Sequence, residues 1–304
     1  YNTCIKDQAN RGTCVSFALN AAIEIHTYLE TQKAVNLSEQ YTYASAEIYT
    51  GGTDRYEYGL SASRTADNFI KEEVGLPLEY KWFYNPSPDI NDYTATPNSN
   101  NEYANSCTGY KGQMCTNYTF QCEEELDFTS ESGHLIYNYT YEMPTSSSTY
   151  KWEIKDELSF WDWSQNNEES SLQKAILFVQ KKVPVIVGFT VKESFMNATD
   201  NGGYVRYSSD DNGSGGHAAI ITGYVANDDL PEGVEPATGE GFFIIRNSWG
   251  TEVGDGGFYY VDYKYLKHNT SSLHLIDISR PSTADLESLP GTTIKPVLDV
   301  DIKH

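Results

Sequence analysis

A single cysteine stands at the start of a stretch that is expected to form a helix. Cys14 follows Gly12 and Thr13, and the apolar residues after it have the three- and four-residue spacing of a helix with one buried face. A thiol in the first turn lies near the partial positive charge of the helix N-terminus, which favours the thiolate, the nucleophilic form. On this local pattern alone, a small buried core cysteine fits equally well. The apolar positions are Val15, Leu19, Ala22, Ile23 and Leu29.

Two distant stretches favour the reactive cysteine. His217 begins an apolar, strand-like run behind Gly215 and Gly216, which leave space beside the ring, and Asn247 directly follows a second apolar run. A nucleophilic cysteine needs an imidazole to take its proton, and the imidazole needs a third group to orient it. A lone histidine at a strand end is more often structural. Together, however, Cys14, His217 and Asn247 predict a nucleophile, its proton partner and an orienting amide.

Three further residues fit the same chemistry. Gln8 lies six positions before Cys14, near enough for its side-chain amide to join the Cys14 N–H in stabilising an oxyanion. Gly12 leaves room for a backbone to approach the sulfur. Trp249 follows Asn247 closely and is expected to screen the histidine–asparagine hydrogen bond from water, although a core tryptophan gives the same pattern.

These motifs resemble the papain family of cysteine peptidases, in a divergent form of the kind associated with bacteria and archaea. The resemblance covers residues 1–83 and 166–265. It implies an α+β, papain-like two-lobe fold, with an N-terminal helical lobe, a C-terminal antiparallel β-barrel-like lobe and the active-site cleft between them. The residues that carry it are Gln8, Gly12-Thr13-Cys14, Phe17, Leu37-Ser38-Glu39-Gln40, Gly216-His217-Ala218 and Asn247-Ser248-Trp249-Gly250, with Gly254 and Gly256-Gly257 after them.

The resemblance also assigns roles. It makes Cys14, His217, Asn247 and Gln8 catalytic and implies no cofactor. By position it makes the turn before the third helix a backbone contact for an extended substrate, although a bare helix-entry turn is the alternative there. The expected substrate-binding residues are Gly59, Leu60, Gly215, Gly216 and Trp249.

The chain departs from the family pattern around the nucleophile. Arg11 stands where the family has a first cysteine, so the loop disulfide made by that cysteine is absent, and Val15 stands where the family has an aromatic residue. His217 lies 203 residues beyond Cys14 (217 minus 14) and Asn247 lies 233 beyond it (247 minus 14). The family separation is about 130–150 residues, so tens of extra residues are inserted here.

Composition limits the partners. The net charge of −22 would repel the phosphates of a nucleic acid, and the 39% hydrophobic content fits a globular protein. No run of eighteen apolar residues is present, so no membrane span is expected. We expect a monomer that binds a peptide or protein substrate. Because Gln8 lies only seven residues after Tyr1 and no signal peptide precedes it, we also expect either a mature form, from which an inhibitory propeptide has been removed, or a trimmed chain.

The other four cysteines predict disulfides. Cys4, Cys107, Cys115 and Cys122 allow two bridges in three connectivities. Cysteine usage and the Asn/Ser/Thr-rich middle of the chain suit an oxidising setting, which predicts a secreted or otherwise extracytoplasmic protein. The run from Cys107 to Cys122 lacks the paired spacing and the histidines of a zinc site, so no metal is expected.

The spacing of apolar residues, and the proline-, glycine- and serine-rich stretches that interrupt secondary structure, divide the chain into four parts. These are a helical lobe carrying the nucleophile (1–83), a cysteine-containing insertion (84–165), a β-rich lobe carrying His217 and Asn247 (166–278) and a C-terminal extension or linker (279–304). The insertion is either a surface decoration or a rim that narrows the cleft. The expected helices are 14–31, 38–50 with Ser38 as N-cap, 62–74 ending at Gly75, and 170–182, and the expected strands are 183–189, 203–207, 217–225, 242–246 and 257–263.

The predicted activity is hydrolysis of peptide bonds through an acyl-enzyme on Cys14. Two alternatives stay open. One is a catalytically silent relative that binds peptides or a partner protein, and the other is an acyl transferase that uses the same residues with an amine as acceptor. The sequence does not distinguish endopeptidase from exopeptidase action.

Overall fold

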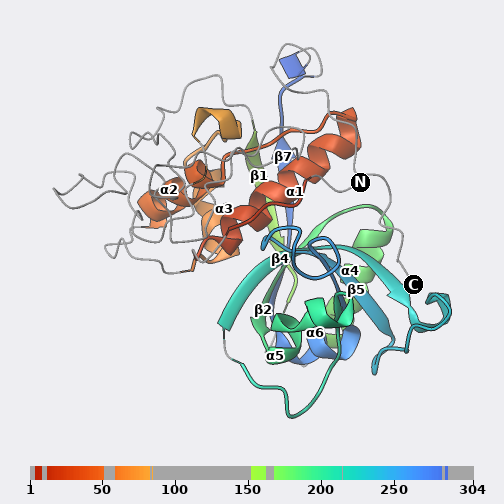
Figure 1. Ribbon diagram of the computed structural model, residues 1–304. Helices are drawn as coiled ribbons and strands as arrows, with labels where there is room; N and C mark the ends of the chain where they lie inside the picture. The colour runs from red at the N-terminus through yellow and green to blue at the C-terminus, as the bar shows by residue number, and fades with distance from the viewer. Residues whose placement is uncertain are drawn as a thin grey trace, which may run out of the picture.

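The computed structural model describes residues 4–8, 12–50, 59–82, 84, 152–161, 168–213, 215–282 and 285–286, with only the backbone for residues 47–50. Figure 1 shows α1, α2 and α3 gathered on one side of the molecule, and the greater part of the sheet with α4, α5 and α6 on the other. The helices are α1 (Cys14–Thr31), α2 (Glu39–Thr50), α3 (Ala62–Lys71), α4 (Glu168–Gln180), α5 (Glu193–Met196) and α6 (Tyr263–Asn269), and short 3-10 turns span Glu79–Lys81, Ala198–Asn201 and Asn227–Asp229.

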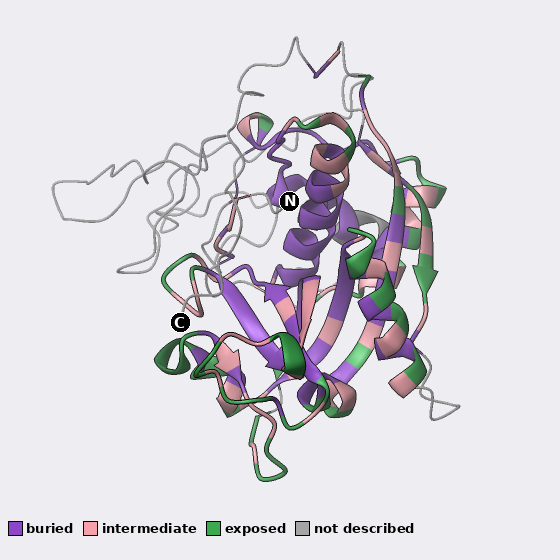
Figure 2. Cartoon of the chain, turned by 90° about the vertical axis from the view of Figure 1, so that its right-hand side faces the viewer, coloured by how far each residue is buried: buried purple, intermediate pink, exposed green. Residues whose placement is uncertain are grey.

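The first helix lies in the interior of the protein. It begins at Cys14, as predicted, and its residues are buried on nearly every side in the first three turns. Figure 2 shows it as an almost continuous buried ribbon. Small residues such as Ala18, Ala21 and Ala22 allow the sheet and α2 to approach closely from different directions. The helix therefore connects the two halves of the protein and serves as the rigid support of Cys14.

The second and third helices differ in how well the sequence predicted their ends. Ser38 caps α2 as predicted, because its Oγ accepts a hydrogen bond from the Tyr41 N–H at 3.1 Å. The prediction that α3 ends at Gly75 is wrong, since α3 ends at Lys71. Glu73 takes a left-handed φ of 50°, and the Val74 N–H donates to the Phe69 carbonyl at 2.9 Å, the bond pattern of a Schellman motif.

The described strands form one seven-stranded sheet in the order β1-β7-β2-β4-β5-β6-β3. All neighbours are antiparallel except β3 and β6, which are parallel. The expected α+β class is therefore confirmed, and the described sheet is mixed and open rather than a closed barrel. The strands are β1 (Glu153–Ser159), β2 (Val185–Val191), β3 (Tyr204–Val205), β4 (Gly215–Ala226), β5 (Gly241–Arg246), β6 (Phe258–Asp262) and β7 (Thr270–Ser279).

Helices on both faces explain why the sheet stays open. Successive side chains of a strand point to opposite faces. In β4, Ala218 and Ile220 pack into the core around α1, whereas Ala219 and Ile221 pack into the core around α4 and α6. A strand that is covered on both sides reads as a continuous apolar run, as the Ala-Ala-Ile-Ile segment of β4 does. Burial on both faces by helices leaves no apolar face that closure into a barrel would cover.

The strand β1 lies within the range predicted as an insertion. It pairs with β7, with Ser159 opposite His274, and Trp152 just before it donates from its indole N–H to Thr27 of α1 at 3.1 Å. The domain boundaries stay predictions. The three cysteines from 107 to 122 lie outside the described residues, as does most of 279–304. Leu286, in that last range, is buried in the core around α1.

Two elements near the end of the chain were not predicted. The helix α6 and the strand β7 follow β6 directly, and β7 lies inside the sheet between β1 and β2. By contrast, α4 lies close to its predicted position, and Leu172, Ala175 and Val179 form its buried face as expected.

The left-handed turn at the end of α3 gives a test of local strain. Replacing Glu73 by glycine should raise the free energy of unfolding by about 1 kcal/mol, since a side chain in the left-handed region is strained and glycine is not. The neighbouring Glu72, at φ −94°, is also exposed and provides the control. Glu72→Gly should lower the free energy of unfolding in urea, and equal effects of the two substitutions would contradict the assignment of strain to residue 73.

Candidate active site

The packing of α1 on β4 and the pairing of β4 with β5 bring the predicted site residues into one region. Cys14 is the first residue of α1, and His217 lies near the start of β4. β4 pairs with β5 so that Ile220 faces Arg246, and Asn247 follows directly. His217 is 7% exposed and Asn247 is 2% exposed, so both side chains are shielded from water.

The imidazole and the carboxamide are joined directly. His217 Nε2 lies 2.7 Å from Asn247 Oδ1, and the Ser248 backbone N–H donates to the same oxygen at 2.8 Å. Two N–H donors on one carboxamide oxygen fix which arm of the amide faces the ring. With Nε2 engaged, Nδ1 is the ring nitrogen that remains for a proton exchange elsewhere.

Aromatic rings surround the imidazole. The Trp249 ring centre is 4.7 Å from that of His217, with 36° between the planes. Phe189 of β2 meets the imidazole edge-on at 5.6 Å, and Phe195 of α5 lies 6.3 Å away. These apolar rings exclude water and lower the local dielectric. Burial accordingly lowers the pKa of His217 to about 4, while the hydrogen bond to Asn247 acts in the opposite direction.

Cys14 lies beside the residue that follows His217. It is 8% exposed, and burial raises the pKa of its thiol. A hydrogen bond to the sulfur from the backbone of Ala218 opposes this rise, as do backbone hydrogen bonds from Val15 and from Cys14 itself. Thr13 makes no side-chain cap at the start of α1, because its hydroxyl lies 2.7 Å from the Tyr84 hydroxyl instead.

Gln8 reaches the site through the segment after Asn247. Its backbone N–H donates to the Ser248 carbonyl at 2.8 Å, and the Ser248 hydroxyl donates to Gln8 Oε1 at 2.7 Å. The Tyr84 hydroxyl donates to the Gln8 carbonyl at 2.9 Å. These contacts hold the carboxamide by its oxygen and direct its NH₂ group away from Ser248.

The predicted substrate-binding residues lie at different distances from His217: Trp249 packs against its ring, whereas Gly59 and Leu60 precede α3. Gly59 precedes α3 and is exposed, and Leu60 is partly buried against the core around α1. Gly215 and Gly216 are exposed at the start of β4, and a methyl group on either would meet open space. Sterics therefore do not require glycine at these positions. Among the described residues, no three His, Cys, Asp or Glu side chains are grouped to hold a metal ion.

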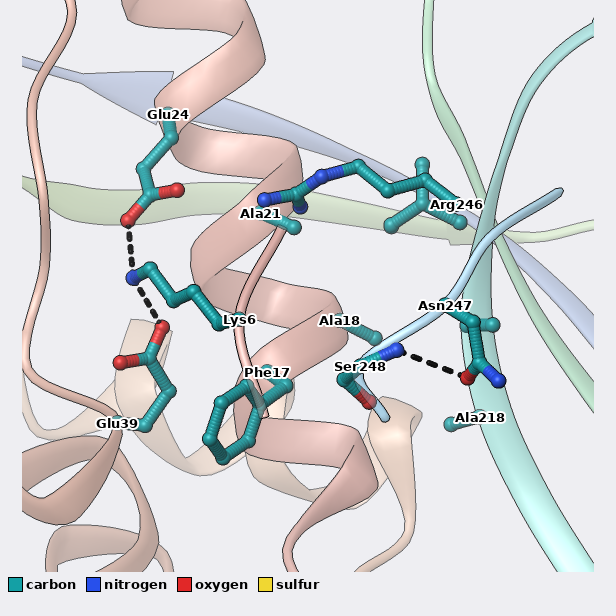
Figure 3. A pocket seen from close by; sticks show the side chains of 12 residues that line it. Lys6, Phe17, Ala18, Ala21, Glu24, Glu39, Ala218, Arg246, Asn247 and Ser248 are labelled. Carbon is teal, nitrogen blue, oxygen red and sulfur yellow. Dashed lines mark hydrogen bonds and ion pairs between the residues drawn. The ribbon is translucent and has the colours of Figure 1, made fainter. Parts of the chain in front are cut away.

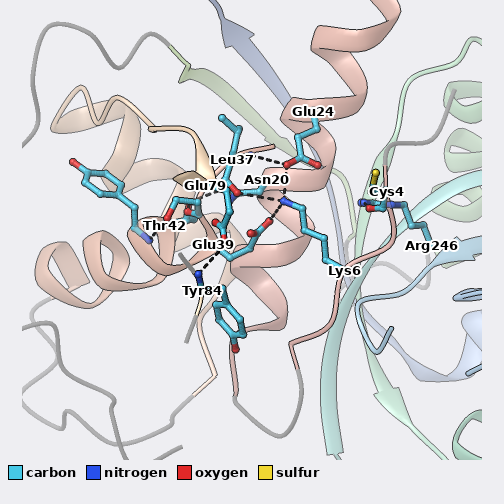
Figure 4. A network of polar contacts seen from close by, with 12 residues as sticks. Cys4, Lys6, Asn20, Glu24, Leu37, Glu39, Thr42, Glu79, Tyr84 and Arg246 are labelled. Carbon is cyan, nitrogen blue, oxygen red and sulfur yellow. Dashed lines mark hydrogen bonds and ion pairs between the residues drawn. The ribbon is translucent and has the colours of Figure 1, made fainter. Parts of the chain in front are cut away.

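A buried charge cluster supports the N-terminal segment that carries Gln8. Lys6 Nζ lies 2.7 Å from Glu24 Oε1 of α1 and 2.5 Å from Glu39 Oε1 of α2, and all three side chains are almost fully buried (Figure 4). Arg246, next to Asn247, donates from Nη2 to the carbonyl of Cys4. The cluster thus places one cation two residues before Gln8 and another directly before Asn247.

A small cavity lies between this cluster and the site. Figure 3 shows Phe17 and Ala18 of α1 on one side of it and Asn247 with Ser248 on the other. Its volume is about 10 Å³, roughly the room that one water molecule occupies. Such tight packing leaves little freedom for the loop that carries Asn247 to shift against α1.

The third carboxyl group of the cluster is Glu79. Its Oε1 accepts from the Tyr84 N–H at 2.7 Å, whereas its buried Oε2 has no hydrogen-bond partner among the described residues. Burial and the neighbouring Glu39 raise the pKa of Glu79 well above the usual 4.5, and burial raises the pKa of Glu39 to about 7. Lys6 and Arg246 offer two positive charges to three carboxyl groups, so one bound proton leaves the cluster neutral.

Sequence reasoning assigned no role to several residues that support the site. Ser248 and Glu39 stand inside the quoted motifs, and their positions were the available signal. Phe195 and Lys6 carry no such signal, because an apolar residue in a short helix and a single lysine are common anywhere.

The fold is similar to those of known cysteine proteases. The structure of xylellain, a cysteine protease from Xylella fastidiosa, superposes with a TM-score of 0.58 at 19% identity, covering 91% of this chain and 82% of that one. At this identity the likeness shows a shared, papain-like fold. Digestive cysteine proteinase 1 of Homarus americanus is 27% identical over 158 residues, which are 48% of this chain and 46% of that protein.

The family follows from the sequence as a whole. The profile of the papain family cysteine proteases matches residues 2–274, and the chain belongs to this family. An uncharacterized peptidase C1-like protein of Acanthamoeba polyphaga mimivirus is 34% identical over 85 residues, 27% of this chain and 24% of that protein. The matches span less than half the length of these two curated relatives.

The raised pKa values in the cluster predict how stability depends on pH. The folded state holds these protons more tightly than the unfolded state does, so the free energy of unfolding falls as the pH rises from about 4.5 toward 7. Glu79→Gln keeps the acceptor for Tyr84 and removes the titration. At pH 8 it should therefore raise the free energy of unfolding by about 1–3 kcal/mol, and at pH 5 it should change it by less than about 0.5 kcal/mol.

Urea unfolding at the two pH values provides the measurement. Glu72→Gln, an exposed carboxyl change outside the cluster, is the control and should show no difference between pH 5 and pH 8. If Glu79→Gln shifts stability equally at both pH values, Glu79 does not hold the proton of the cluster.

Proposed function

We propose that the chain is a cysteine peptidase that hydrolyses peptide bonds through an acyl-enzyme on Cys14. The observation that carries the proposal is the buried His217–Asn247 hydrogen bond, located beside the residue whose backbone contacts the Cys14 sulfur. A nucleophile, an imidazole and an orienting amide at one place are the parts that acyl transfer through a thiol requires.

Because both side chains are buried, a Cys14 thiolate and a His217 imidazolium are favoured only when they form together. Burial raises the pKa of Cys14 and lowers that of His217, so a lone thiolate and a lone imidazolium are both disfavoured. Transfer of the thiol proton to Nδ1 creates both charges at once, and their attraction in a low dielectric offsets the cost of burial. Asn247 Oδ1 then accepts from the imidazolium through Nε2–H, and the N-terminus of α1 faces the thiolate.

In the first half of the reaction, the Cys14 sulfur attacks the substrate carbonyl carbon and forms a carbon–sulfur bond. The tetrahedral oxyanion is stabilised by the Cys14 N–H and by the NH₂ group of Gln8, whose oxygen is held by Ser248. The carbon–nitrogen bond breaks as His217 gives its proton to the leaving amine. In the second half, a water loses a proton to His217, attacks the thioester and releases the acid with the thiol.

The substrate is proposed to be a peptide or protein bound in extended form. The exposed backbones of Gly59, Gly215 and Gly216 allow a peptide to approach closely, which supports backbone contacts at these positions. Leu60 and Trp249 are proposed to add apolar contact.

The setting of the protein is also a proposal. Among the described cysteines Cys14 is free, whereas Cys4 is not, which supports disulfides and therefore a secreted or otherwise extracytoplasmic location. Family membership supports the removal of an inhibitory propeptide, and we propose that the mature chain acts as a monomer. Among the helices that the structure describes, none is both long and apolar enough to cross a membrane.

Products formed from a peptide library separate the candidate activities. Hydrolysis gives free acids, transfer to an added amine gives amides, and a silent binding protein gives neither. Mass spectrometry of the fragments also distinguishes cleavage inside peptides from removal of terminal residues.

Substitutions at two positions test the proposed roles. Cys14→Ala should abolish turnover, and Gln8→Ala should lower kcat/KM by roughly 10²–10³-fold, because one oxyanion donor is lost. Gln173→Ala is the control for the second change, since the Gln173 side chain of α4 bonds to the exposed Glu240 and should keep full activity. Full activity of Cys14→Ala in a peptide hydrolysis assay would reject the mechanism.

A further inference from the structure

The Asn247 carboxamide is held by its oxygen, while its nitrogen is unsatisfied. Oδ1 accepts from His217 and from the Ser248 N–H, but Nδ2 is buried and has no hydrogen-bond partner among the described residues. A buried donor without an acceptor is costly, and in a native protein it calls for a structural or catalytic explanation.

Tyr259 provides a hydroxyl beside this carboxamide. The Asn247 N–H donates to the Gly257 carbonyl at 3.0 Å, and Tyr259 pairs with Ile245, two residues before Asn247, so the side chains of Tyr259 and Asn247 lie on the same face of the sheet. Tyr259 is 1% exposed. Burial raises the pKa of the Tyr259 phenol, and hydrogen bonding to the Asn247 side chain lowers it, although the pair falls short of full hydrogen-bond geometry. The neutral hydroxyl therefore adjoins the amide.

The ring of Tyr259 is fixed by its neighbours. It stacks on Phe195 at 4.5 Å with 6° between the planes, and it meets Trp249 edge-on at 6.3 Å. Phe195 and Trp249 are the same rings that enclose His217. The phenolic oxygen is therefore held at one position relative to the histidine–asparagine pair.

We propose that Tyr259 is a positioning residue whose phenolic oxygen accepts a hydrogen bond from Asn247 Nδ2 while His217 carries the proton. This inference rests on the proposed function, because it assigns Tyr259 a part in orienting the imidazolium. Positive charge on the imidazole polarises the carboxamide through Oδ1 and makes Nδ2–H a stronger donor. An acceptor at Nδ2 then strengthens the bond between Asn247 and His217.

The chemistry of tyrosine suits this position better than a charged acceptor does. A carboxylate beside Asn247 would add a buried charge, whereas a neutral hydroxyl supplies an acceptor at little cost. Phenylalanine in its place would keep the stack on Phe195 and remove only the acceptor. Tyr259→Phe is therefore a conservative test.

The experiment compares Tyr259→Phe with Tyr265→Phe in steady-state peptide hydrolysis over a range of pH. Tyr265 is also buried, but its hydroxyl donates to the Thr190 carbonyl and accepts from the Lys192 N–H, both at 3.0 Å. Tyr259→Phe should lower kcat by roughly five- to tenfold and leave KM within about twofold of the parent value. The alkaline limb of its kcat/KM profile should move to lower pH, because the imidazolium is less stabilised, and Tyr265→Phe should leave the profile unchanged.

A double-mutant cycle with Asn247→Ala completes the test. Without the carboxamide the hydroxyl has nothing to orient, so Tyr259→Phe should cause no further loss of residual kcat in that background. Equal kinetics and pH profiles for Tyr259→Phe and Tyr265→Phe, or fully additive losses in the cycle, would overturn the role of Tyr259. These outcomes leave the proposed function intact, which fails separately if Cys14→Ala keeps full turnover.

Discussion

The packing of the first turn of α1 against β4 is the contact on which the rest of the structure depends. It brings Cys14 to the backbone of Ala218, the neighbour of His217, although the two stretches are about two hundred residues apart in the chain. Small residues on both elements make this close approach possible, with Ala18 on the helix and Ala218 on the strand lining the same cavity. A larger side chain at either position would push α1 away from β4 and move Cys14 away from the backbone of Ala218.

The same burial makes charged side chains in the site costly, because water is excluded from them. Rings from Phe189, Phe195 and Trp249 exclude water from His217, and the N-terminal segment with Gln8 closes over the loop after β5. That segment is anchored by Lys6, whose charge is balanced by carboxylates of α1 and α2. A buried ion cluster is a weak source of stability, but it specifies geometry, because each charge tolerates few other arrangements. Here it fixes the position of Gln8 and of the residue before Asn247 together.

The sequence predicted well those features that are encoded locally. The start of α1 at Cys14, the Ser38 cap and the buried face of α4 follow from periodicity and from single capping residues. It failed where the outcome depends on distant partners. The position of β7 inside the sheet depends on pairing with β1 and β2, and the open sheet depends on helices covering both faces. The sequence also did not predict the role of Lys6, since only the fold brings the carboxyl groups of Glu24 and Glu39 within reach of it.

The most direct test of the account is the rate of alkylation of Cys14 by iodoacetamide as a function of pH, followed by mass spectrometry of the peptide that contains it, in the parent protein and in His217→Ala. If the imidazolium stabilises the thiolate, Cys14 of the parent protein should be alkylated rapidly well below pH 8. The curve of alkylation rate against pH should then have its inflection far under the ordinary thiol pKa of about 8.5. In His217→Ala the inflection should rise to that value or above it, because burial alone acts on the thiol. The same inflection in both proteins would contradict the pairing of residues 14 and 217.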